Sequence, residues 1–129
     1  MYRPGLSIIV PTYNESENIS SLIKSIAWTM VESDIPYEIV IIDDHSTDQT
    51  NRIVKALAKH YPITFQQKVG KRGMGYSILE GYPLTTYEYL AILDADGRYS
   101  PEYLPTLLDL AIKYGFAVAN RENLRVGLF

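Results

Sequence analysis

The sequence predicts an α/β domain with a mostly parallel sheet flanked by helices. Short apolar, β-branched runs alternate along the chain with longer segments whose apolar residues recur at helical spacing. Such alternation is typical of βαβ units, in which helices cover both faces of a parallel sheet. Polar or acidic residues directly follow several of these runs, and ligands of parallel sheets bind beside the carboxyl ends of the strands.

The first expected strand is the β-branched run at residues 6–10, which ends at Pro11. Residues 14–18 then supply helix-capping side chains and acids, and apolar residues recur at helical spacing over residues 19–30. Asp34-Ile35-Pro36 breaks this helix. The chain is therefore expected to open with a buried strand and an amphipathic helix.

A second strand is expected at residues 38–42, a β-rich run that leads into Asp43-Asp44. Residues 45–48 can cap a helix whose apolar face comes from residues 53–58. A weaker strand signal follows at residues 63–67. These segments repeat the strand–helix order of the first unit.

The third unit begins with a glycine-rich loop at residues 70–75 and a short helix over residues 78–82. Residues 88–93 are the next expected strand. Ser100-Pro101-Glu102 is a strong helix start, because it combines a capping serine, a proline at the first helical position and an acid near the positive end of the helix dipole. The apolar residues at 104–112 are expected to face the core.

Gly115 is expected to end this helix, and residues 116–119 have the composition of a last strand. We therefore expect one domain over residues 1–120. Residues 121–129 form a basic, partly apolar stretch without a closing strand or helix. We interpret them as an exposed tail or as the start of a further part of a longer protein.

Composition excludes several classes of protein. The chain of 129 residues has the length of one domain, and 47% hydrophobic residues fit a globular protein. A net charge of −3 gives no basic footprint for nucleic acid, and the absence of cysteine excludes disulfides and thiolate metal sites. No apolar segment approaches the roughly 20 residues that span a bilayer, and none forms a signal peptide. We expect a cytoplasmic domain, whose substrate can still be a membrane lipid.

Three polar clusters at the ends of expected strands predict one ligand site. Asp94-Ala95-Asp96 offers carboxylates to a hard divalent cation, which commonly shares its coordination with phosphate oxygens. Within residues 11–15, the Tyr13 ring can pack on a base or ribose, and Glu15 can accept hydrogen bonds from either. Asp43-Asp44 can also bind a base or ribose. Singly, each cluster is explained about as well by a solvated turn or a helix start.

The glycine-rich loop does not identify a nucleotide-binding class by itself. Gly70 and Gly75 have Walker A spacing, but Tyr76-Ser77 stands where Lys-Ser/Thr is required, so a P-loop NTPase is excluded. No G-x-G-x-x-G follows the first strand, which argues against a dinucleotide-binding oxidoreductase. Lys71 and Arg72 could meet phosphate charge, although a flexible surface turn explains the loop nearly as well.

Taken together, the clusters resemble a known family. The segments at residues 7–15 (Ser-Ile-Ile-Val-Pro-Thr-Tyr-Asn-Glu), 38–46 (Glu-Ile-Val-Ile-Ile-Asp-Asp-His-Ser) and 93–96 (Leu-Asp-Ala-Asp) resemble glycosyltransferase family 2. The nearest branch contains the dolichol-phosphate and polyprenyl-phosphate mannosyl- and glucosyltransferases. Residues 71–76 resemble its Lys-x-Gly-x-Gly loop, and residues 100–102 its Pro-Glu helix start. Order and spacing agree over nearly the whole chain.

The resemblance implies a Rossmann-like GT-A fold that binds a nucleotide-diphosphate sugar with a divalent cation, Mg²⁺ or Mn²⁺. The residues implied to contact the donor are Pro11, Tyr13, Glu15, Ile42, Asp44, Asp94, Ala95, Asp96 and Arg121. Among them, Asp94 and Ala95 would lie by the ribose, and Asp96, with Asp94, would hold the metal. Lys71 and Arg98 are further candidates for phosphate contacts.

The implied reaction transfers a hexose, with inversion, from a GDP- or UDP-linked sugar to a polyprenyl or dolichyl phosphate at the cytoplasmic face of the membrane. An acceptor phosphate is already anionic, so we nominate no catalytic base, and we expect Asp43 to support the strand end. Family members continue well beyond this length, so the chain resembles their donor-binding half. Two alternatives stay open. One is a donor-binding half-domain that needs a homo-oligomer or partner chain for turnover, and the other is a sugar-phosphate nucleotidyltransferase.

One departure from the family pattern concerns the metal. Family members often follow the second metal-site aspartate with x-Gln or x-Ser and a histidine, whereas this chain has Gly97-Arg98-Tyr99. A glutamine side chain can complete a metal shell and Arg98 cannot. Arg98 is instead suited to neutralising part of the diphosphate charge.

Overall fold

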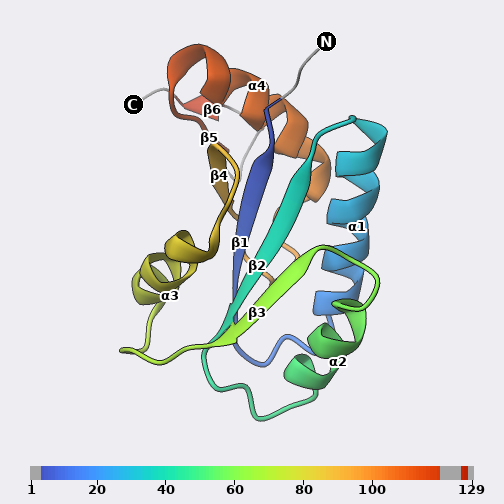
Figure 1. The fold of residues 1–129 in the computed structure, drawn as a ribbon, viewed down its shortest axis with the longest axis vertical. Helices are drawn as coiled ribbons and strands as arrows, with labels where there is room; N and C mark the ends of the chain where they lie inside the picture. Colours follow the sequence, from blue (N-terminus) through green and yellow to red (C-terminus); the bar gives the residue numbers. More distant parts are fainter. Residues whose placement is uncertain (1–3, 120–125, 128–129) are drawn as a thin grey trace.

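A parallel sheet of four strands in the order β3-β2-β1-β4 organises the fold (Figure 1). The computed structural model describes residues 4–119 and 126–127. The strands are β1 (Leu6–Thr12), β2 (Tyr37–Asp43), β3 (Ile63–Gln67), β4 (Tyr89–Ile92), β5 (Val118–Ala119) and β6 (Val126–Gly127). The helices are α1 (Ile19–Glu32), α2 (Thr50–Leu57), α3 (Met74–Gly81) and α4 (Leu104–Tyr114), with 3₁₀ turns η1 (Tyr82–Leu84) and η2 (Pro101–Tyr103). The predicted α/β class and parallel sheet are confirmed.

The side chains of the central strands divide between two apolar layers. Ile8, Val10, Ile39 and Ile41 pack with buried residues of α1, α2 and α4 on one face. Ile9, Val40 and Ile42 pack on the other face, which α3 covers. Figure 1 shows α1 and α2 on one side of the sheet and α3 on the other. Because both faces are buried, the strands are continuously apolar rather than alternating.

Pro11 does not end the first strand, contrary to the prediction. The strand continues to Thr12, and Pro11 pairs in register with Ile42 of β2. The carbonyl of Ile9 accepts a hydrogen bond from the Leu93 N–H at 3.0 Å and so faces β4. The carbonyl of Thr12 accepts the Asp44 N–H and so faces β2. Strand alternation therefore points Pro11 to the β4 side, beyond the last β1–β4 pair at Ile9. The missing N–H of proline removes no ladder hydrogen bond there.

Several local expectations were wrong. Neither Asn18 at the start of α1 nor Ser100 before η2 makes a side-chain capping hydrogen bond, and Pro101 begins a 3₁₀ turn ahead of α4. Ile112 is exposed rather than facing the core. Residues 121–129 were expected to lack a strand, but Val126–Gly127 pairs antiparallel with β5. Gly115 does end α4 as predicted, with a left-handed φ of 86°.

Candidate functional site

The carboxyl ends of the parallel strands bring the three predicted clusters to one edge of the sheet. Thr12, the last residue of β1, pairs with Asp43, the last residue of β2. On the other side of β1, Ile9 pairs with Ile92, so Asp94 and Asp96 follow β4 beside the exit of β1. This placement was predicted from the sequence, and it is set by strand register rather than by contacts among the acids.

Asp43 joins the two strand ends from within the fold. It is fully buried, and its Oδ1 accepts hydrogen bonds from the Thr12 hydroxyl at 2.7 Å and the Ser46 hydroxyl at 2.6 Å. Its Oδ2 accepts the Ser46 N–H at 2.8 Å. A buried carboxylate with this many donors is a structural anchor. The expectation that Asp43 supports the strand end is confirmed.

The loops after β1 and β2 are tied together by side-chain hydrogen bonds. Asn14, at a left-handed φ of 51°, accepts the Thr47 N–H on its Oδ1 at 2.8 Å and donates its own N–H to the Ser46 hydroxyl at 2.8 Å. Asp48 accepts the N–H and the hydroxyl of Thr50 at 2.9 and 2.5 Å. These hydrogen bonds, led by that from the Thr50 hydroxyl, lower the pKa of Asp48 to about 2. These hydrogen bonds therefore join the two loops into one unit next to Tyr13.

Asp44 has an oxygen without a hydrogen-bond partner. The Asp44 Oδ1 atom is buried, yet no group in the described part of the chain forms a hydrogen bond with it. Lys68 Nζ lies 3.6 Å from Oδ2 and Arg72 Nε lies 3.6 Å from Oδ1, both at ion-pair distance. Because buried acceptors are normally satisfied, this oxygen is available to a ligand donor.

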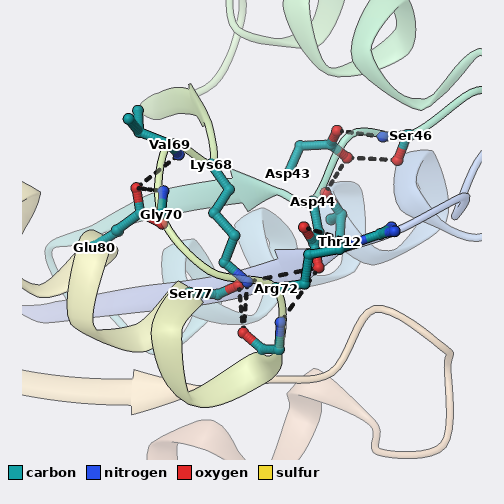
Figure 2. A network of polar contacts seen from close by, with 11 residues as sticks. Thr12, Asp43, Asp44, Ser46, Lys68, Val69, Gly70, Arg72, Ser77 and Glu80 are labelled. Carbon is teal, nitrogen blue, oxygen red and sulfur yellow. Dashed lines mark hydrogen bonds and ion pairs between the residues drawn. The ribbon is translucent and has the colours of Figure 1, made fainter.

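The glycine-rich loop contacts Asp44 and is held by hydrogen bonds from Lys68 and to Glu80 (Figure 2). Lys68 is completely buried, and its Nζ donates a hydrogen bond to the Gly73 carbonyl at 2.5 Å. Glu80 of α3 accepts the Val69 N–H at 2.8 Å through Oε1. Gly73 begins α3 at a φ of 119°, a conformation that favours glycine. Sequence reasoning missed Lys68, because lysine is seldom fully buried, and it missed the half-buried Glu80, because no motif marks either residue.

Tyr13 presents its ring at the surface of the site. Its side chain is 49% exposed, and the Arg72 guanidinium lies 5.3 Å from the ring centroid. A planar guanidinium over a tyrosine ring is a cation–π contact, and it covers the face on which a base could pack. The Arg72 side chain is itself 68% exposed, so few packing contacts oppose a change in its position. Lys71 lies similarly over Tyr76, at 5.9 Å.

The metal site expected at Asp94 and Asp96 is only partly assembled. No group of three His, Cys, Asp or Glu side chains that could hold an ion occurs among residues 4–119. Asp96 accepts the Arg98 N–H at 3.0 Å, and the Arg98 Nε lies 3.1 Å from its other oxygen. Carboxylate oxygens suit Mg²⁺ and Mn²⁺, so the two aspartates fit a cation that phosphate oxygens complete, provided that Arg98 turns away.

The remaining predicted contact residues differ in what they can offer a ligand. Ile42 and Ala95 are buried at 0% and 3% exposure, so their side chains are part of the apolar core. Pro11 is half-buried, and Glu15 is half-buried with its Oε2 3.3 Å from the Asn18 amide nitrogen. Arg121 lies outside the described residues.

A separate cleft of about 690 Å³ lies between β4 and α4. Asp94 lines one part of it, whereas Tyr13 and Asp44 do not. Its other lining is mostly apolar and includes Ile92, Leu107 and Phe116.

Within the part of the chain that the structure describes, no helix is long and apolar enough to cross a bilayer.

Comparison with known proteins shows which sequences share this pattern. The dolichol-phosphate mannosyltransferase of Pyrococcus furiosus is 32% identical over 114 residues, which are 88% of this chain and 32% of that protein. The dolichol-phosphate mannosyltransferase of Saccharomyces cerevisiae is 31% identical over 124 residues, which are 95% of this chain and 46% of that protein. The chain thus spans between a third and a half of these relatives.

Solved structures share the same architecture. The mannosyltransferase PcManGT of Pyrobaculum calidifontis, solved with GDP-Man and Mn²⁺, is 34% identical with a TM-score of 0.64 over 74% of this chain and 28% of that chain. TarS of S. aureus, solved as residues 1–349 with UDP-GlcNAc, is 26% identical with a TM-score of 0.67 over 86% of this chain and 32% of that chain. The predicted GT-A fold is confirmed. The family described as "Glycosyl transferase family 2" matches residues 7–125, and the chain belongs to that family.

Proposed function

We propose that the chain is the donor-binding part of an inverting hexosyltransferase and that its site holds a nucleotide-diphosphate sugar. One observation carries the proposal. The buried Asp44 Oδ1 lacks a hydrogen-bond partner at the same strand edge as the exposed Tyr13 ring and the Asp94–Asp96 pair. An acceptor, an aromatic face and acidic metal ligands along one edge match the base, ribose and diphosphate of such a donor.

The nucleoside end of the donor is assigned to Tyr13 and Asp44. A base stacking on the Tyr13 ring would take the place that Arg72 now covers, and its N–H groups would donate to the Asp44 carboxylate. We assign Glu15, Pro11 and Ile42 to the same end of the donor, since Pro11 pairs with Ile42 at the ends of β1 and β2. This part of the site reads a base through hydrogen bonds, so it can distinguish GDP from UDP.

The diphosphate end is assigned to Asp94, Asp96 and the basic residues around them. Asp96 and Asp94 would hold a divalent cation, which supplies positive charge to the diphosphate when bound. Arg98 would leave Asp96 and turn to a phosphate oxygen, and Lys71 and Arg121 are further candidate phosphate contacts. The mannosyltransferase PcManGT, 34% identical to this chain, was solved with Mn²⁺, which supports a cation in this class of site.

The proposed reaction is a displacement at the anomeric carbon of the sugar. The bond from that carbon to the donor phosphate oxygen breaks, the acceptor oxygen forms the new bond from the opposite face, and the nucleoside diphosphate leaves. Positive charge from basic side chains stabilises the leaving group. Dolichol-phosphate and undecaprenyl-phosphate transferases among the relatives support a lipid phosphate as acceptor. Such an acceptor is anionic, so the chain needs no general base.

A second candidate is a donor-binding module that performs no turnover alone. The chain covers 32% and 46% of two dolichol-phosphate mannosyltransferases, so the acceptor site of those proteins can lie in the part that this chain does not match. Turnover of a GDP- or UDP-sugar by the 129-residue chain with a polyprenyl phosphate would exclude this candidate. Binding of the donor without turnover would favour it.

Calorimetric titration of the chain with GDP, UDP and their mannose and glucose conjugates, with and without Mn²⁺, tests the proposed function. We expect one of the two bases to bind, and we expect Mn²⁺ to strengthen binding. Asp96→Ala should remove the metal effect and leave weak metal-independent binding of the nucleoside. If no nucleoside diphosphate binds, or if the metal has no effect and Asp96→Ala binds like the parent chain, the proposal is wrong.

A further inference from the structure

Lys68 is a buried cation that the proposed donor contacts do not use. Its side chain has 0% exposure although lysine is almost never fully buried without a partner. Its Nζ donates a 2.5 Å hydrogen bond to the Gly73 carbonyl and lies 3.6 Å from Asp44 Oδ2. A charge removed from water in this way is stable only because both neighbours carry negative or partly negative oxygens.

The position of Lys68 connects two parts of the site that are distant in sequence. The Lys68 N–H donates to the Asp43 carbonyl at 2.8 Å, so the backbone of Lys68 continues the sheet next to Asp44. Its side chain (Figure 2) then reaches across to the carbonyl of Gly73, the residue before α3. One residue therefore contacts both the acceptor for a base and the loop that borders it.

Asp44 has two cationic neighbours, and they differ in mobility. Arg72 Nε and Lys68 Nζ lie at the same distance, 3.6 Å, from the two carboxylate oxygens. Arg72 is 68% exposed and covers the Tyr13 ring, so a stacking base must displace it. The Lys68 side chain is fully enclosed, so it stays beside Asp44. Once Arg72 moves, Lys68 is the cation that still faces Asp44.

We propose that Lys68 is a positioning residue for the nucleoside. It fixes the position of the Asp44 carboxylate, with Oδ1 turned to the ligand, and it holds the glycine-rich loop at residues 70–75 against that carboxylate. This inference rests on the proposed function, because it assigns Lys68 a role through Asp44 in the same site. The Gly73 N–H also lies 3.5 Å from Asp44 Oδ2, so the loop and the lysine act on the same carboxylate. A lysine without a role in binding could be replaced without a change in nucleotide affinity.

A double-mutant cycle separates these roles. Lys68→Met keeps the length and apolar stem of the side chain and removes the charge, and Asp44→Asn removes the charge of its partner. With GDP or UDP as the probe, whichever the parent chain binds, we expect each single variant to weaken the dissociation constant about tenfold or more. In the Asp44→Asn background, Lys68→Met should weaken it by less than about threefold, since the two residues act as a unit.

Limited trypsin digestion supplies a readout that needs no ligand. Lys71 and Arg72 are exposed cleavage sites in the loop that Lys68 holds. Lys68→Met should accelerate cleavage after these residues, as measured by mass spectrometry. Lys24→Met is the matched control, because Lys24 is an exposed lysine of α1 on the opposite face of the sheet. It should leave both cleavage and nucleotide binding at the parent level.

Several outcomes would overturn the inference. Lys68→Met could bind nucleotide like the parent, or its effect could multiply fully with that of Asp44→Asn, which would make the residues independent. If Lys68→Met does not fold, Lys68→Gln keeps a hydrogen-bond donor without the charge, and the same loss of affinity is expected. A parent chain that binds neither GDP nor UDP contradicts the proposed function instead. The trypsin experiment does not depend on that result: unchanged cleavage in Lys68→Met would contradict the claim that Lys68 anchors the loop.

Discussion

The hydroxyl of Thr12 donates a hydrogen bond of 2.7 Å to the buried carboxylate of Asp43 and so joins the ends of β1 and β2. The same carboxylate holds the Ser46 N–H and hydroxyl at 2.8 and 2.6 Å. Because Asp44 follows directly, this anchor fixes the strand end from which the Asp44 carboxylate projects. The candidate site is therefore built on a buried polar network rather than on its exposed loops.

Replacing Thr12 with valine should destabilise the fold. The variant keeps the shape of the side chain but removes one hydrogen-bond donor to Asp43, which costs about 1.5–3 kcal/mol for a hydrogen bond to a charged group. Urea unfolding followed by circular dichroism measures the change. Thr64→Val, an exposed threonine of β3, is the matched control and should not reduce the free energy of unfolding. Equal stabilities of Thr12→Val and the parent would contradict the anchoring role.

Asp48 should make the fold sensitive to acid in a defined range. Its pKa is lowered to about 2 by hydrogen bonds led by the Thr50 hydroxyl, whereas an aspartate in the unfolded chain titrates near 3.9. The unfolded state therefore binds the proton more readily, and this contribution to stability is complete above about pH 4 and is lost as the pH falls towards 2. Unfolding curves at pH 5, 4, 3 and 2 should show a smaller acid-induced loss for Asp48→Asn than for the parent. Parallel pH profiles of the two proteins would refute the assignment.

At Gly81, the last residue of α3, the helix packs tightly against the sheet. A Cβ atom there would lie 3.2 Å from side-chain atoms of Ile42 and Ile9, so Gly81→Ala should overpack the core and cost about 1–3 kcal/mol. Gly75→Ala in the same helix meets no atom within 4 Å and should be neutral or slightly stabilising. Thermal unfolding of the two variants measures the difference. A Gly81→Ala variant as stable as Gly75→Ala would show that α3 can move away from the sheet without cost.

Arg98 should compete with a cation for Asp96. Its Nε lies 3.1 Å from the carboxylate, so Arg98→Gln removes a competing positive charge and adds an amide oxygen that can complete a metal shell. We expect tighter Mn²⁺ binding in the absence of nucleoside diphosphate, where Arg98 still pairs with Asp96, as measured by calorimetry. Arg52→Gln, an exposed arginine of α2, is the control for the change in net charge. Unchanged or weaker Mn²⁺ binding in Arg98→Gln alone would mean that the ion pair does not limit the site.

The sequence was informative where periodicity and register decide the structure. The parallel sheet, the residues of β3 and the common edge of the three clusters follow from apolar runs and from the geometry of βαβ units. Pro11 misled the prediction because its effect depends on which neighbour strand it faces. Ser100 misled it because a favourable capping residue does not decide between a 3₁₀ turn and an α-helix.

The parts of the site that could not be predicted depend on burial. Lys68 and Glu80 carry no sequence signal, and their contacts with the glycine-rich loop arise where α3 packs against β1 and β2. The free oxygen of Asp44 is likewise a property of distances in the folded chain. Sequence therefore placed the candidate site at a sheet edge, whereas the structure identified the loop anchor and the Asp44 oxygen without a hydrogen-bond partner.

The most direct test of the central claim is an amide chemical-shift titration of the ¹⁵N-labelled chain with GDP and UDP in the presence of Mg²⁺. The account predicts that the shifted amides gather at residues 13–15, 43–46, 70–75 and 94–98, with one base binding more tightly than the other. The opposite result would be shifts that gather around the cleft between β4 and α4, at residues such as Leu107 and Phe116, with the Tyr13 and Asp44 amides unmoved. That pattern would contradict a donor site at the carboxyl ends of β1 and β2.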